Sequence, residues 1–207
     1  MEREDEFETH ITVRPADTAE VERLRAWAAE SGLKFTHIIL AQGRTPSQPM
    51  LTFHNRAPLG RQWAVATTVA DAVHHCNRFP ATRIKVEMAA TSPTVPQSND
   101  EGEAQPPERY FEHHVKLLLD DEADMPQLIR VALCHTAHVS RNALRTRDDG
   151  RHERFVTQRC FGVGRASAHA ALVALVEALE GTYEIMDVEE EFVMFDSDLT
   201  LDAGWIE

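Results

Sequence analysis

Two carboxylate–histidine pairs with the same spacing stand in the two halves of this chain. Glu8 lies two residues before His10, and Glu112 lies two residues before His114, 104 residues further along. In an extended strand, residues two apart point to the same face, so each histidine would have a carboxylate beside it. Such a carboxylate fixes the tautomer of the imidazole and raises its basicity, as general acid–base catalysis requires. The spacing therefore predicts His10 and His114 as the candidate catalytic residues.

Other polar residues recur at nearly the same offset. Thr52 matches Thr157, Glu87 matches Glu191, and the segment Gly60-Arg61-x-x-Ala64 matches Gly164-Arg165-x-x-Ala168. These matches indicate an internal duplication, so that the two halves can be aligned with each other to find polar residues that recur at equivalent positions. Common descent alone could preserve some of these residues. The predicted ligand-binding residues are Glu8, Thr52, Arg61, Glu87, Glu112, Lys116, His138, Thr157, Arg159, Arg165 and Glu191.

Each half has the residue pattern of a β-α-β-β-α-β unit. Alternating polar and apolar residues predict strands at 8–14, 35–40, 50–54 and 82–88, and again at 111–119, 137–144, 154–161 and 183–195. Two helices are expected in each half, and Asp17 and Asp124 are the predicted caps of the first in each. The pattern resembles the ferredoxin-like plait. That resemblance implies an α+β fold with two antiparallel sheets, strand order 4-1-3-2 in each, and both helices of a unit on one face.

The domain boundaries follow from composition. We expect a first repeat at 6–90, a flexible linker at 91–109, a second repeat at 110–196 and a C-terminal tail at 197–207. Proline, serine, glutamine and acidic residues dominate the linker, where Val95 is the single large apolar residue. The tail carries an apolar residue, Trp205, that no pattern places.

The strand alternation also separates the faces of each sheet. Ile11 and Val13 would lie under the helices, and His10 would lie on the open face. Because the first strand is central in the expected order, His10 should lie near Thr52 and Glu87. If the two open faces packed together, they would form a pseudo-symmetric polar cleft, and pockets are common at such interfaces. A simple cross-strand pair on a solvated face is the structural alternative for each residue.

A cleft of this composition would suit a small anionic ligand. Lys116, Arg141 and Arg159 could supply positive charge, and Arg61 and Arg165 stand at helix starts, where free N–H groups can hold an anion. A turn glycine followed by a surface arginine is the simpler explanation of the last two.

A divalent metal is a further possibility, because two histidines and two carboxylates can hold Zn²⁺, Mn²⁺ or Fe²⁺. His10, Glu87, His114 and Glu191 stand on the first and last strands of their units. This placement is similar to that of paired-module glyoxalase-like proteins, although those modules lack the second helix predicted here.

Two other classes of function remain open. His10-Ile11-Thr12 and His138-Val139-Ser140 resemble the paired H-x-T/S motifs of the two-histidine phosphoesterases, although they are not equivalent positions of the repeat. A non-catalytic interaction or regulatory module is the alternative from another class. In such a module the open strands would be buried against another chain.

Composition limits the partners. The net charge of −13 argues against general nucleic-acid binding, since contact with phosphates needs a basic surface. No apolar run has the length of a membrane span, and the acidic N-terminus is unlike a targeting segment. Three cysteines without C-x-x-C spacing favour reduced thiols, so we expect a cytoplasmic protein without a membrane partner. The oligomeric state is left open.

Overall fold

The computed structural model describes residues 4–77, 79–120, 123–144 and 147–204. The first half contains β1 (Asp5–Val13), α1 (Thr18–Glu30), β2 (Lys34–Leu40), β3 (Ser47–Ala57), α2 (Leu59–Asn77) and β4 (Ala81–Ala89). After α3 (Asn99–Glu103), the second half contains β5 (Tyr110–Leu119), α4 (Met125–Cys134), β6 (Ala137–Asn142), β7 (His152–Cys160), α5 (Arg165–Leu179) and β8 (Glu184–Asp196). A 3₁₀ turn, η1 (Leu199–Asp202), follows β8.

The β-α-β-β-α-β order and the predicted strand order are confirmed in both halves. The strands run β4-β1-β3-β2 in the first half and β8-β5-β7-β6 in the second, and every pair is antiparallel. The predicted helix caps are also present. Asp17 accepts a hydrogen bond from the backbone N–H of Glu20, and Asp124 accepts one from that of Gln127.

The expectation of two separate sheets needs correction. β2 pairs with β6, and β4 pairs with β8, so that all eight strands form one closed barrel. Separate four-stranded sheets would each leave two edges with unpaired backbone N–H and C=O groups, and the two cross-pairings satisfy part of them. No local pattern in the sequence marks such long-range pairing, because the β2–β6 contact involves only Ile38–Leu40 on one side.

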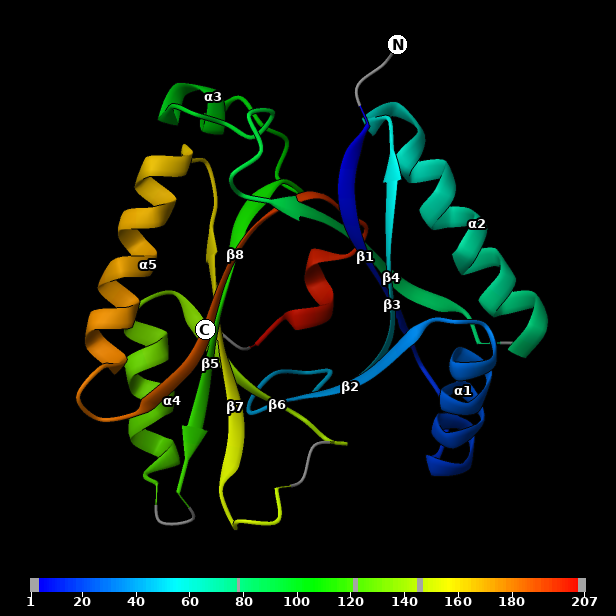
Figure 1. The fold of residues 1–207 in the computed structure, drawn as a ribbon, viewed down its shortest axis with the longest axis horizontal. Coiled ribbons are helices and arrows are strands. Elements are labelled where there is room, and N and C mark those ends of the chain that lie inside the picture. Colours follow the sequence, from blue (N-terminus) through cyan, green and yellow to red (C-terminus); the bar gives the residue numbers. More distant parts are fainter. Residues whose placement is uncertain (1–3, 78, 121–122, 145–146, 205–207) are drawn as a thin grey trace.

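The helices cover the outside of the barrel (Figure 1). α1 and α2 lie over the strands of the first half, while α4 and α5 lie over those of the second. The apolar side chains pack between helices and strands, as Ile11 and Leu24 do in the first half and Val115 and Leu172 do in the second. The opposite, polar faces of the strands therefore point into the barrel, so that the two predicted open faces do lie opposite each other.

Residues 91–109 were expected to form a flexible linker, but part of this segment is packed. Ser98 caps the short helix α3, and Gly102 and Val95 are buried. The backbone N–H of Gly164 donates to Asn99 Oδ1, at 2.9 Å, so that α3 lies over the start of α5. A polar composition does not exclude such packing when a small residue allows the backbones to approach closely. The domain boundaries remain a prediction.

The C-terminal tail enters the barrel. In Figure 1, η1 lies between the strands of the two halves, and Leu201 and Asp202 are buried. Trp205 lies outside the described residues. Among the helices of the described part, none has the length and apolar character needed to cross a membrane.

Candidate functional site

The barrel encloses a cavity of about 310 Å³. Every strand contributes polar or charged side chains to its wall, and the apolar side chains come from β2, β3 and β7. The lining residues are Glu8, His10, Thr12, Lys34, Thr36, Ile38, Leu40, Gln48, Met50, Thr52, Arg83, Lys85, Glu112, His114, Lys116, His138, Ser140, Asn142, Phe155, Thr157, Arg159, Asp187, Glu189, Glu191 and Asp202.

In the first half, His10 is held between a carboxylate and a hydroxyl group. Its Nε2 lies 2.7 Å from Glu87 Oε2, and its Nδ1 lies 2.7 Å from Thr52 Oγ1. The strand register produces this group, because His10 stands directly opposite Thr52 on β3 and Glu8 stands opposite Glu87 on β4. The predicted proximity of the three side chains is confirmed.

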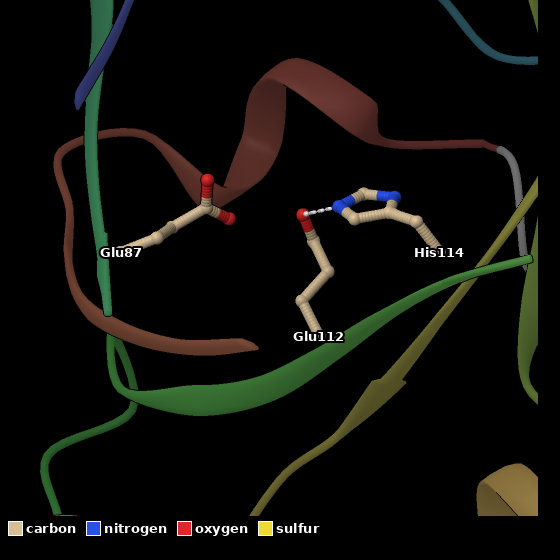
Figure 2. Close-up of side chains that lie close together, drawn as sticks. All are labelled: Glu87, Glu112 and His114. Carbon is tan, nitrogen blue, oxygen red and sulfur yellow. Dashed lines mark ion pairs between the residues drawn. The ribbon is translucent and has the colours of Figure 1, made fainter. Parts of the chain in front are cut away.

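The second half repeats this arrangement. His114 Nδ1 lies 3.0 Å from Thr157 Oγ1, and its Nε2 lies 3.5 Å from Glu191 and 3.4 Å from Glu112. The register is equivalent, with His114 opposite Thr157 and Glu112 opposite Glu191. Figure 2 shows the imidazole of His114 beside the Glu112 carboxylate, with Glu87 pointing toward the same region.

The two histidines differ in what surrounds their carboxylates. Lys85 Nζ lies 2.7 Å from Glu87 Oε1 and also contacts Glu112 Oε1. Burial disfavours the ionised form of Glu87, but Lys85 and His10 outweigh it and lower the pKa of Glu87 to about 2. Burial likewise disfavours a charged Lys85, and Glu112 and Glu87 outweigh it, so that the pKa of Lys85 is raised. Glu87 and Lys85 are thus both charged at neutral pH.

His114 has carboxylates on two sides. Burial alone would lower the pKa of His114, but the hydrogen bonds and charges of Glu112 and Glu191 raise it to about 10. For Glu191, burial and the negative charge of Glu87 outweigh the attraction of His114, and its pKa is raised. His114 is therefore an imidazolium at neutral pH, and it cannot serve as a general base there.

A second cluster of buried charged side chains contains Arg83, Arg159 and their carboxylate partners. Arg83 binds Asp196 through Nε, at 2.8 Å, and Asp202 through Nη1, at 2.8 Å. Arg159 binds Glu112 through Nε, at 2.6 Å, and Asp202 through Nη2, at 2.8 Å. The hydroxyl of Tyr110 donates to Asp196. The buried cations of the barrel are thus matched by carboxylates, as burial of charge requires.

Sequence reasoning missed four residues of this region: Gln48, Arg83, Lys85 and Asp202. The strand alternation that selected Glu87 also places Lys85 and Arg83 on the inner face. The internal repeat does not mark Lys85 and Arg83, because the residues 104 positions later, Glu189 and Asp187, are acidic rather than basic. Asp202 stands after the last strand, where no periodic pattern applies.

Most of the predicted site residues line the cavity, and Glu87 lies directly behind His10. Arg61 and Arg165 do not line it. Arg61 is exposed in the first turn of α2. The backbone N–H of Arg165 donates to Pro96 O, so the start of α5 is covered by the segment that precedes α3.

His138 lies in the wall with its Nδ1–H donating to Thr157 O, and burial and Arg159 lower its pKa well below the usual value. His138 is therefore neutral.

Three side chains could direct ligand atoms to one metal ion. One atom each from Glu87, Glu112 and His114 lies within 4.8 Å of the others. This set differs from the predicted His10, Glu87, His114 and Glu191. The ammonium group of Lys85 contacts both carboxylates of the set, so a divalent cation could use them only after displacing Lys85.

Comparisons with known proteins give only distant likenesses. No family model and no curated protein matches the chain. Among solved structures, the ligand-free regulatory subunit of aspartate kinase from Thermus thermophilus matches with 16% identity and a TM-score of 0.32, over 85% of this chain and 93% of that one. The small subunit of acetolactate synthase from Thermotoga maritima matches with 12% identity and a TM-score of 0.27, over 93% and 97%. A putative chlorite dismutase, TA0507, matches with 12% identity and a TM-score of 0.30, over 92% and 96%. At these scores the function must be argued from the cavity itself.

Proposed function

We propose that this protein binds a small anionic molecule with an apolar part inside its barrel. The observation that carries the proposal is one cavity of about 310 Å³ onto which both histidine–threonine pairs open. Ligand pockets commonly have volumes from about 300 Å³ upward and combine apolar walls with a few polar groups.

The apolar and the charged side chains of the cavity wall come mostly from different strands. Ile38, Leu40, Met50 and Phe155 provide apolar surface. The charged groups belong mostly to β4, β5, β8 and the tail. A ligand with a polar head and an apolar part would match both regions, because apolar contact supplies binding energy and a few polar contacts fix the orientation.

Six carboxylates and five Lys or Arg side chains line the cavity, so an anionic head would lie against a cationic part of the wall. His114 is an imidazolium, and Lys34 also lines the cavity. Within the part of the chain that the structure describes, no carboxylate pairs with Lys34. The inward orientation of both polar faces also favours a ligand site over an interaction module, because another chain could reach those faces only if the barrel opened.

Acid–base catalysis by His10 is a second candidate function. Glu87 is ionised, so Nε2 of His10 must donate its proton to that carboxylate. Nδ1 then faces the hydroxyl of Thr52 at 2.7 Å, a distance at which a proton can be exchanged. We infer that His10 is the general base and that the imidazolium of His114 is a fixed positive charge.

The phosphoesterase alternative has one structural point in its favour. His10, Thr12, His138 and Ser140 all line the cavity. They come from β1 and β6, which are not equivalent strands of the two halves. Hydrolysis of small cyclic phosphodiesters is the direct assay for this alternative.

The binding proposal is tested by a thermal-shift screen. The ligands would be small carboxylates and phosphates with an apolar substituent, each compared with its neutral amide or alcohol counterpart. We expect Thr52→Val and Thr157→Val to reduce the shift given by a binding anion, because each removes a hydroxyl from the cavity wall. Thr68→Val is the matched control, since Thr68 is an exposed residue of α2 whose hydroxyl binds Ala64 O. Equal shifts in all three variants would contradict the proposal.

A further inference from the structure

Three donors from three strands converge on the carboxylate of Asp202. Arg83 Nη1 and Arg159 Nη2 each lie 2.8 Å from Oδ2, and Gln48 Nε2 lies 2.6 Å from Oδ1. The four residues are at most 6% exposed, and all of them line the cavity. Two guanidinium groups and an amide around the two oxygens of a carboxylate form a geometry that is specific for such a group.

The three donors and the carboxylate acceptor come from different parts of the chain. Gln48, Arg83 and Arg159 belong to β3, β4 and β7, which are strands of the barrel wall. Asp202 belongs to the short turn η1, which follows the last strand and reaches into the barrel from its end. The wall thus forms a carboxylate receptor, and the tail of the same chain supplies the carboxylate.

Without Asp202, both guanidinium groups of the receptor lose a carboxylate partner. Arg83 would keep Asp196 and Arg159 would keep Glu112, a carboxylate that Lys85 and His114 also contact. Arg83 Nη1, Arg159 Nη2 and Gln48 Nε2 would then lose the acceptor on which they converge, in a buried region. A buried charge without sufficient compensation is costly, so an anion from solution would be attracted to the place that Asp202 leaves.

In the part of the tail that the structure describes, backbone hydrogen bonds on both sides of η1 add to the three bonds of Asp202. The backbone N–H of Ser197 donates to Ile84 O and that of Arg44 donates to Ala203 O, each at 3.0 Å, and Leu201 is buried. Exchange of Asp202 for another carboxylate therefore requires the movement of one short turn rather than of a strand.

We propose that Gln48, Arg83 and Arg159 bind the carboxylate of the ligand and that Asp202 is an internal competitor for this site. This inference rests on the proposed function, because it assigns a position to the head of the anionic ligand. It adds that the ligand is a carboxylate and that its binding releases η1 from the barrel.

The test uses acetate as the probe, in full-length wild type and in Asp202→Ala. We expect Asp202→Ala to have a lower Tm, and acetate to raise that Tm in a saturable manner. Acetamide, the neutral counterpart, should not do so. Calorimetric titration should show acetate binding at least tenfold more tightly to Asp202→Ala than to the wild type. Glu22→Ala is the control for loss of a carboxylate, because Glu22 is an exposed residue of α1 that pairs with Arg25.

Two further variants keep the test decisive. If Asp202→Ala does not fold, Asp202→Asn keeps the shape of the side chain and removes its charge, and a weaker but still saturable acetate response is expected, because acetate must displace the amide. Addition of Arg83→Gln to either variant should abolish the response, since it removes one of the converging donors. Absence of saturable acetate binding in both Asp202 variants would overturn the inference, and so would a response that survives Arg83→Gln. Tighter binding of inorganic phosphate than of acetate would overturn the assignment of a carboxylate.

This outcome is separable from that of the proposed function. Acetate binding to Asp202→Ala requires no knowledge of the cavity ligand. If a ligand found in the screen depends on Thr52 but is unaffected by Asp202→Ala, the carboxylate site is wrong and the binding proposal stands. If acetate binds and no larger anion does, the receptor is real and the binding proposal loses its support.

Discussion

The charge of His114 should make the stability of this protein depend on pH in the alkaline range. Its pKa is raised from an ordinary value of 6.5 to about 10 by Glu112 and Glu191, which together overcome the effect of burial. Since one pKa unit corresponds to about 1.4 kcal/mol, the difference amounts to about 5 kcal/mol. A raised pKa in the folded state means that this stabilisation is fully present below pH 6.5 and is lost as the pH rises from 6.5 through 10.

The assay is urea unfolding of wild type and His114→Gln at several pH values from 6 to 10. We expect the variant to be several kcal/mol less stable than the wild type at pH 6, and this difference to shrink steadily toward pH 10. His74→Gln is the control for the same replacement of histidine by glutamine, because His74 is an exposed residue of α2. Comparison with the wild type at each pH cancels the contributions of titrating groups that do not interact with His114.

NMR gives a second, independent measurement. The ring carbon shifts of His114 should be those of an imidazolium at pH 8. A ring that titrates near pH 6.5 would refute the reasoning, and so would a stability difference between wild type and His114→Gln that is constant from pH 6 to 10. Either result would mean that Glu112 and Glu191 do not hold a charge on the imidazole.

Three more predictions follow from the buried charges and from a close backbone contact. Lys85→Met should lower the free energy of unfolding in urea by about 3–5 kcal/mol, because it leaves two buried carboxylates without their ammonium partner. The same variant should gain a site for Zn²⁺ or Mn²⁺, which elemental analysis would detect. Equal metal content in the wild type and in Lys85→Met would contradict this second expectation. Glu87→Gln should be less stable than wild type at pH 7 but nearly equal at pH 2, because a carboxyl with a pKa lowered to about 2 stabilises above pH 4.5 and loses that effect as the pH falls through 2. Gly164→Ala should lower the Tm, since its Cβ would meet the backbone of Ser98 at 2.5 Å, whereas the equivalent Gly60→Ala has nothing within 4 Å and should be neutral. Equal Tm values for the two glycine variants would mean that the segment before α5 is not packed as described.

Sequence patterns could predict the strand faces and the paired His–Thr–Glu groups, because each depends on local rules. Alternation places His10 on the inner face of β1, and the recurrence of His114 and Thr157 in the second half marks the same positions as a set. Closure of the barrel could not be predicted in this way. It depends on pairing between β2 and β6, and between β4 and β8, whose residues lie about 100 positions apart and carry no shared pattern.

The recurrence of residue types does not reveal that the carboxylates beside the two histidines have different ion-pair partners. Lys85 stands where the second half has Glu189, so the carboxylate beside His10 is bound to an ammonium group. Glu191, the equivalent carboxylate beside His114, has no such partner in the described contacts. Opposite charges at equivalent positions balance each other inside one closed barrel, where two lysines or two glutamates would repel. The carboxylates beside the two histidines therefore differ in their partners, although the two halves look alike in sequence.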